Sequence, residues 1–360
     1  MRLYPFAAAG VSVVLAAVVL WQVVESSNDL GDVPAYSPRP LPSDLVPEVT
    51  VDQGMSPRDI GNRLENAGVI TSATQFSILV SLLGYDGILQ AGDYEFDLGT
   101  PALTAVYRIR QGQTTTRSIT VTEGWRLEEV ADALDKLGIP RDEFLSEAVT
   151  RNFARSSARP DGYDFLPTTG RNVSLEGYLY PATYPVRKDD TPESILNKML
   201  KAFQDNVTPD IRSAAQSVGL DQHDVITLAS IIEREAVVPD ERPIIAQVFL
   251  SRLRQGMSLE ADPTVQYAVA QDAASVAQFG YWKKDLTRAD LDVDSPYNTY
   301  LNSGLPPGPI CNPRLESIEA VVHPATTNYL YFVAKGDGTH AFATTLQEHM
   351  DNIKKYQGGQ

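Results

Sequence analysis

The sequence predicts an α+β protein made of an N-terminal transmembrane helix, a small α+β module and a larger mixed α+β domain. Three observations carry this prediction: an uncharged N-terminal run, a repeated strand–helix pattern after it, and a later series of amphipathic helices separated by Pro- and Gly-rich loops. At 360 residues the chain exceeds one ordinary domain. We expect an anchor at 1–24, a linker at 25–47, a module at 48–140 and a domain at 141–360.

The predicted anchor is the run of 22 uncharged residues from Leu3 to Val24. A helix of about 20 apolar residues crosses a bilayer. Arg2 precedes this run and Glu25 follows it, so the positive-inside bias places the N-terminus in the cytoplasm and the body on the outer face of the cell membrane. A cleaved signal peptide is the alternative, but QVVESSND after the run offers no small-residue cleavage pattern.

The next segment, 25–47, holds five prolines and little apolar periodicity, so it is predicted to be an extended spacer. An internal repeat follows it. TVDQGMSPRDIGNRLENAGVI from Thr50 matches TVTEGWRLEEVADALDKLGI from Thr120 at an offset of 70 residues. Each copy predicts a short strand, a Gly turn and a helix that ends at Gly. AGDYEF, AVYRIR and RSITV, which lie between the copies or begin the second one, are predicted to be strands.

The second half is predicted to be more helical. Apolar residues recur at helical spacing in 191–207, 223–236 and 243–256. Loops rich in Pro, Gly, Asn and Tyr occupy 295–314, and 327–345 is predicted to be a hairpin around Lys335-Gly336-Asp337-Gly338. LQEHMDNIKKY is predicted to be a final helix.

Composition excludes several classes of function. The net charge of −16 and the absence of a basic run argue against nucleic-acid binding. The single cysteine, Cys311, excludes an intramolecular disulfide, and the four histidines form no metal-ligand spacing. The sequence therefore predicts no metal and no cofactor.

The helix LASIIEREAVVPDERP is unusual because it carries acidic side chains in an apolar pattern. At about 100° per residue, Glu235 falls about 20° from Leu228, inside the apolar arc, and Glu233 falls at its edge about 140° away. We therefore expect Glu235 to face inward and Glu233 to be solvated or ion-paired. A buried carboxyl group keeps its proton, which is what a general acid requires. A structural role, paired to a buried Arg or to backbone groups, remains the alternative for Glu235.

Two stretches are rich in tyrosine: EGYLYPATYPV at 176–186 and YNTY at 297–300. Aromatic faces stack on sugar rings, and amides and hydroxyls satisfy sugar hydroxyls. The stretches therefore favour a glycan groove, although a single Tyr is more often a core residue. His323 and His340 are expected to be structural histidines.

Five segments together resemble one known family. ASIIEREA, ERPIIAQVFLSRLRQGMSLEADPTVQYA, YNTYLNSGLPPGPICNP, HPATTNYLYFV and HAFATTLQEH look like the YceG-like endolytic murein transglycosylases (the MltG family), and the repeat region is similar to that family's LysM-like portion. The resemblance implies a membrane-anchored lyase that cleaves MurNAc–GlcNAc β-1,4 bonds of peptidoglycan, leaves 1,6-anhydro-MurNAc ends and terminates nascent glycan strands. It also implies cell-wall synthesis proteins as partners.

By the same resemblance, the second glutamate of the I-E-x-E motif is catalytic, and it falls on Glu235. The resemblance also implies the following substrate-binding residues: Tyr178, Tyr180, Asp262, Thr264, Tyr267, Tyr297, Asn298, Thr299, Tyr300 and Asn312. Two positions depart from the family pattern: Ala182 stands where an Asp is common, and Arg314 stands where a Gly is common. The sequence shows no obvious second inward acid.

Two alternatives remain at this point. A non-catalytic tether would use the repeat module to hold glycan, with Glu235 as a packing residue. A water-using muramidase would employ Asp262 or Glu233 as a base and leave reducing ends. The product of cleavage distinguishes all three functions.

Overall fold

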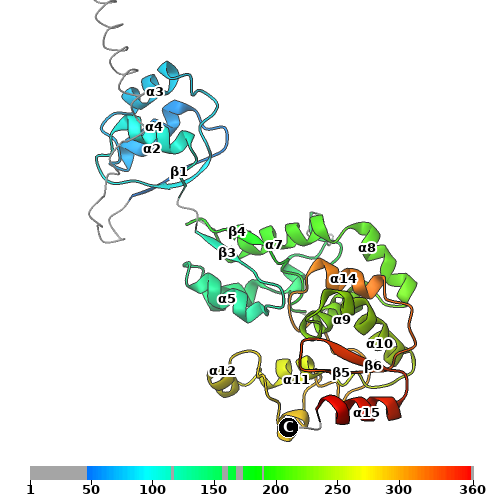
Figure 1. Cartoon of the computed structure of the whole chain (residues 1–360). Coiled ribbons are helices and arrows are strands. Elements are labelled where there is room, and N and C mark those ends of the chain that lie inside the picture. The colour runs from blue at the N-terminus through cyan, green and yellow to red at the C-terminus, as the bar shows by residue number, and fades with distance from the viewer. Residues whose placement is uncertain (1–46, 115–116, 156–160, 168–172, 189, 358–360) are drawn as a thin grey trace, which may run out of the picture. The chain divides into compact units, whose positions relative to one another are not determined.

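The computed structural model describes residues 47–114, 117–155, 161–167, 173–188 and 190–357 (Figure 1). The predicted anchor and all but the last residue of the predicted linker lie outside these ranges. Within the described residues no helix is both long enough and apolar enough to cross a bilayer. The chain divides into two compact units, one containing the described residues up to 114 and the other those from 117 onward.

The smaller unit is built from two antiparallel strands and three helices. In chain order these are β1 (Glu48–Val51), α2 (Pro57–Asn66), α3 (Ala73–Leu82), β2 (Gly92–Glu95) and α4 (Ala102–Arg110). Ser56 caps α2, and Val49 of β1 pairs with Tyr94 of β2. Gly61 is required where α2 meets α3, because a Cβ atom there would lie 2.8 Å from the carbonyl oxygen of Ala73. The unit has an apolar core of its own.

The predicted strand at AVYRIR is wrong, since these residues belong to α4. Ala102, Ala105, Val106 and Ile109 are buried, at the spacing of one helix face. Arg108 and Arg110 lie outside that face, over the rings of Phe96 and Tyr85. The alternation of apolar and polar residues over these six positions is also compatible with a helix. The spacing of the buried residues is that of a helix. The strand predicted at AGDYEF is confirmed as β2.

The larger unit contains the remaining elements. They are β3 (Ser118–Thr120), α5 (Leu127–Asp135), α6 (Arg141–Glu147), η3 (Thr150–Asn152), β4 (Thr183–Pro185), α7 (Pro192–Asn206), α8 (Pro209–Ala214), η4 (Ala215–Val218), α9 (Gln222–Glu235), η5 (Pro239–Glu241), α10 (Arg242–Arg254), α11 (Asp262–Val269), α12 (Ala273–Phe279), α13 (Arg288–Leu291), α14 (Leu315–Val322), β5 (Tyr331–Ala334), β6 (His340–Ala343) and α15 (Leu346–Tyr356).

The two copies of the sequence repeat have the same local structure. In both, a strand is followed by a glycine with positive φ, Gly54 or Gly124, and then by a helix, α2 or α5. The second copy nevertheless belongs to the larger unit, because β3 pairs with β4 and Val130 and Leu134 join that unit's core. The boundary predicted at residue 140 is therefore wrong, and the division falls near residue 115.

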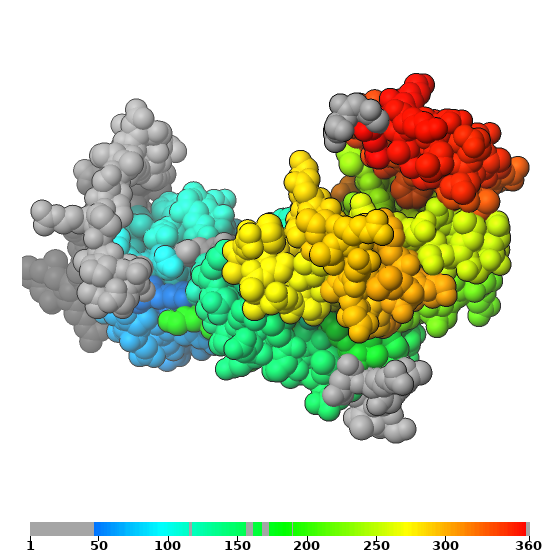
Figure 2. Space-filling model, turned by 90° about the horizontal axis from the view of Figure 1, so that it is seen from below, coloured from blue at the N-terminus to red at the C-terminus, as the bar shows by residue number. Residues whose placement is uncertain are grey.

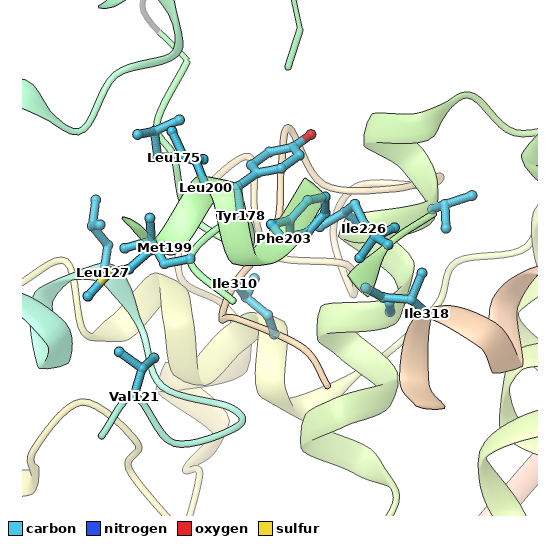
Figure 3. Close-up of a cluster of buried hydrophobic side chains, with 14 of the residues drawn as sticks. Val121, Leu127, Leu175, Tyr178, Met199, Leu200, Phe203, Ile226, Ile310 and Ile318 are labelled. Atoms are coloured by element: carbon cyan, nitrogen blue, oxygen red, sulfur yellow. The ribbon is translucent and has the colours of Figure 1, made fainter. Parts of the chain in front are cut away.

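The helices predicted in the second half are confirmed as α7, α9, α10 and α15, and the predicted hairpin as β5 and β6. α9 packs against both α10 and α14. Figure 3 shows how side chains from α5, α7, α9, α14 and the loops before β4 and α14 meet in one apolar core. On the face shown in Figure 2, the C-terminal hairpin and α15 (red) rise beside the segment of α11 to α13 (yellow to orange), and the surface between them is hollowed.

Candidate active site

A pocket of about 430 Å³ lies where the end of α9 meets the start of α11, the C-terminal hairpin and α15. Glu235 is the last residue of α9, and Asp262 is the first residue of α11. The polar side chains that line the pocket are Glu235, Arg252, Glu260, Asp262, Tyr300, His340, His349 and Gln357. Three of the residues that the sequence predicted for the site, Glu235, Asp262 and Tyr300, therefore meet here.

Glu235 is half-buried at the wall of the pocket. Its carboxyl group has no hydrogen-bond or ion-pair partner among the described residues, so the structural alternative of a pairing with an Arg or with backbone groups finds no support there. Burial, followed by the negative charge of Asp262, raises the pKa of Glu235 to about 8. The carboxyl group therefore carries a proton at neutral pH and, within the part of the chain that the structure describes, donates it to no other group, which leaves it free for a ligand.

Asp262 and Tyr300 form a hydrogen-bonded pair in the same pocket. The Tyr300 hydroxyl donates a 2.7 Å hydrogen bond to Asp262 Oδ1. Burial and this hydrogen bond raise the pKa of Tyr300 far above its ordinary value, so the hydroxyl stays a donor. The pair presents one anionic acceptor beside the neutral Glu235.

Glu233 is more deeply buried than the helical pattern indicated, with 3% of its side chain exposed. It accepts hydrogen bonds from Arg314 Nε at 2.9 Å and from Ser317 Oγ at 2.7 Å. The expectation of a solvated or ion-paired residue is met by the ion pair with Arg314. Arg314, one of the two departures from the family pattern, thus neutralises the first glutamate of the motif.

Three predicted residues support the pocket without lining it. Thr264 and Thr299 are buried, with their hydroxyl oxygens 2.8 Å apart, and Thr299 Oγ1 accepts from the Ala261 amide at 3.0 Å. Asn298 donates to the carbonyls of Leu291 and Val293, both at 2.9 Å, and its Oδ1 accepts from the Tyr300 amide at 3.0 Å. These bonds hold the Asp262 and Tyr300 segments together.

The other five predicted residues do not line this pocket. Tyr178 is buried in the apolar core, with its hydroxyl 2.9 Å from His223 Nδ1. Tyr180 packs on the same core, and Asn312 bonds the Leu179 amide and the Trp125 carbonyl. In the structure these three have packing or bridging contacts, and their contact with substrate stays a prediction.

Tyr267 and Tyr297 belong to a separate buried cluster. Their ring centroids are 4.7 Å apart, and the guanidinium group of Arg126 lies 4.1 Å from the centre of the Tyr267 ring. Glu176 is buried nearby and accepts from the Leu127 amide at 3.0 Å, at the start of α5. Burial, then the charge of Glu128, raises the pKa of Glu176 to about 8. The expectation of no second inward acid is therefore wrong, although this acid caps a helix and does not line the pocket.

Four titratable residues of the pocket were not among the predicted site residues. Arg252 donates to the carbonyls of Leu330 and Leu259, at 2.8 and 2.9 Å, and to Glu260 Oε2 at 3.0 Å. Glu260 has a φ of 52°, which only a few per cent of non-glycine residues adopt. Burial, then the charge of Arg252, lowers the pKa of His349. His340 contacts Glu241, which lies 99 residues earlier in the chain, so no local pattern could indicate the pair.

The chain matches known proteins over most of its length. The model of the YceG-like family matches residues 49–355. An endolytic murein transglycosylase of Bacillus subtilis is 35% identical over 318 residues, which cover 86% of this chain and 84% of that protein. A protein of the same name from Streptococcus pneumoniae is 29% identical and 58% covered, so the chain spans somewhat more than half of its length.

A solved structure agrees with the fold. The crystal structure of a YceG-like protein from Listeria monocytogenes superimposes with a TM-score of 0.57 at 35% identity. The match covers 86% of this chain and 99% of that one.

Proposed function

This chain belongs to the YceG-like family, and from that premise and the geometry of the pocket we propose that it is an endolytic lytic transglycosylase of peptidoglycan. It cleaves the β-1,4 bond between MurNAc and GlcNAc inside glycan strands and leaves 1,6-anhydro-MurNAc ends. The observation that carries the proposal is Glu235, a carboxyl group that keeps its proton at neutral pH and has no partner among the described residues. Curated relatives are named for this activity.

The chemistry needs a proton donor for the leaving oxygen and an internal nucleophile. Glu235 donates its proton to the glycosidic oxygen as the bond to C1 breaks. The C6 hydroxyl of the same MurNAc attacks C1, and the resulting carboxylate of Glu235 is able to take the proton that this hydroxyl loses. No water enters the reaction, so a second carboxylate acting on water is not required.

Asp262 supports a second candidate, a water-using muramidase. It is the other carboxyl group of the pocket that stays free of an ion pair among the described residues, and an inverting hydrolase uses such a group to activate water. The tether is less well supported, because Glu235 lines a pocket and has no hydrogen-bond or ion-pair partner among the described residues. Glu233 is excluded as the base, since Arg314 and Ser317 occupy its carboxylate.

The decisive experiment is product analysis on purified peptidoglycan. The full chain in mild detergent is incubated with isolated sacculi beside Glu235→Gln and Glu143→Gln, whose side chain is exposed on α6. We expect internal anhydro-MurNAc ends from the parent and from Glu143→Gln, and none from Glu235→Gln at an unchanged melting temperature. Reducing ends from the parent would establish the muramidase. Retained cleavage by Glu235→Gln would remove Glu235 from the chemistry.

We also propose the location and the auxiliary parts of the enzyme. The apolar run 3–24 anchors the chain in the cell membrane with its N-terminus in the cytoplasm and the catalytic unit on the outer face. The smaller unit is LysM-like and holds glycan; the order β1-α2-α3-β2 with an independent core supports this assignment. Cell-wall synthesis proteins are the proposed partners, because termination of nascent strands requires proximity to the machinery that makes them.

A further inference from the structure

His340 is a titratable group of the pocket that the proposed reaction does not yet use. It begins β6, its side chain is 8% exposed, and it lines the same pocket as Glu235. Both oxygens of Glu241 hold it: Oε2 lies 2.7 Å from Nδ1, and Oε1 accepts from the backbone amide at 3.0 Å. The Phe332 ring meets the imidazole edge to face, with centroids 5.3 Å apart.

These contacts determine which ring nitrogen is available. A carboxylate is only an acceptor, so Nδ1 carries the hydrogen of the neutral imidazole and Nε2 carries the lone pair. Nε2 has no hydrogen-bond partner among the described residues. The two contacts to Glu241 and the packing of Phe332 fix the orientation of the ring, as a carboxylate does in other carboxylate–histidine pairs.

We propose that His340, oriented by Glu241, is the base that accepts the proton of the MurNAc C6 hydroxyl. This inference rests on the proposed transglycosylase function and divides between two residues the proton transfers that Glu235 could otherwise perform alone. The pocket is lined both by a carboxyl group that can donate a proton and by an oriented imidazole whose Nε2 is available to accept one.

The step balances in atoms and charge. Glu235 gives its proton to the glycosidic oxygen, and the bond from that oxygen to C1 breaks. The C6 oxygen forms a bond to C1, and its proton passes to His340 Nε2. Glu235 ends as a carboxylate and His340 as an imidazolium beside the Glu241 carboxylate. Solvent then returns the proton from His340 to Glu235 before the next turnover.

Charged and titratable groups from several elements lie around His340. They are Glu241 from η5, Glu235 from α9, Arg252 from α10, Glu260 and Asp262 at the start of α11, Tyr300 from the loop before α14, and His349 from α15. Glu241 bonds the imidazole directly, and Arg252 is bonded to Glu260.

The test separates the base from a merely structural histidine. In His340→Asn the side-chain amide lies near the place of Nδ1 and can keep the Glu241 bond, but no atom replaces Nε2. His340→Ala leaves space that added imidazole can enter. His323→Asn, at an exposed histidine of the same unit, is the matched control. The full chain of each variant is assayed on sacculi by mass spectrometry of the released ends, with and without imidazole, and by thermal melting.

We expect His340→Asn to melt like the parent and to release anhydro ends between about 10²- and 10⁴-fold more slowly, the range for a general base. Imidazole should restore a measurable part of the activity of His340→Ala and none to Glu235→Gln, and His323→Asn should match the parent. Two outcomes would overturn the proposal: near-parental rates in His340→Asn, or slow rates in His340→Ala that imidazole does not restore. Either would leave His340 with a structural role in the hairpin.

Failure of the proposed function itself looks different. If the parent releases reducing ends, or if Glu235→Gln still cleaves, the transglycosylase is wrong whatever the His340 variants do. Reducing ends from the parent together with loss of cleavage in His340→Asn would make the imidazole the activator of water, which overturns the C6-hydroxyl assignment.

Discussion

At the scale of single residues, the motif I-E-x-E places two carboxyl groups two positions apart in different environments. Glu233 accepts hydrogen bonds from Arg314 and Ser317, so its oxygens are occupied. Glu235 has no such partner among the described residues and lines a pocket with Asp262, and burial and the negative charge of Asp262 raise its pKa to about 8. Of the two, Glu235 is therefore the carboxyl group that is available as an acid.

The protonation of Glu235 predicts how activity depends on pH. Since the protonated form is the active acid, kcat/KM should fall as the pH rises through about 8, where Glu235 ionises in the folded protein. Asp262→Asn removes the nearby negative charge, which is the smaller of the two causes, so the alkaline limb should move to lower pH by less than about one unit. A pH–rate profile of both proteins checks this. An alkaline limb that stays in place in Asp262→Asn would show that Asp262 does not act on Glu235.

At the scale of secondary-structure elements, the pocket depends on a loop that carries Tyr300 to the start of α11. Asn298 is buried there and satisfies three backbone groups, while Thr264 and Thr299 join the loop to α11. Three long helices of this unit, α7, α9 and α10, lie where apolar periodicity predicted them. The conformation of a loop is not indicated by any periodic sequence pattern. The supporting roles of Asn298 and Thr299 could therefore be seen only from their contacts in the structure.

Asn298→Ala should destabilise the larger unit by about 2–4 kcal/mol and lower cleavage, because it leaves buried backbone groups without partners and loosens the Tyr300 segment. Asn302→Ala is the matched control: it also removes two bonds to carbonyls, but from an exposed side chain that water replaces, so it should cost less than about 1 kcal/mol. Urea denaturation with both variants measures the difference. Equal costs would mean that Asn298 is not the residue that holds the loop.

At the scale of the whole molecule, the described chain has two apolar cores that share no residue. The repeat spans both units: its first copy is part of the smaller unit, and its second copy is part of the larger one. Similar local sequence therefore does not determine which core a segment joins. That choice follows from pairing partners such as β4, which lie far along the chain.

Separate cores predict separate unfolding. Calorimetry of the full chain should resolve two transitions. Phe76→Ala should destabilise the smaller unit and Phe144→Ala the larger one, so each variant should lower the melting temperature of one transition only. The expected loss of unfolding free energy is roughly 3–5 kcal/mol for each buried phenylalanine. A single transition that both variants lower alike would show that the two units unfold together.

Local pattern was sufficient for several central features of this protein. The spacing of apolar residues predicted α7, α9 and α10, the Lys335-to-Gly338 turn predicted the β5–β6 hairpin, and the motif ASIIEREA singled out Glu235. These features depend on residues close in the chain. Other features depend on residues roughly 80 to 170 positions apart. They are the ion pair of Glu233 with Arg314, the orientation of His340 by Glu241, and the packing of Tyr267 and Tyr297 near Arg126. Only folding brings such residues within hydrogen-bonding or packing distance, and those long-range contacts give the pocket its chemistry.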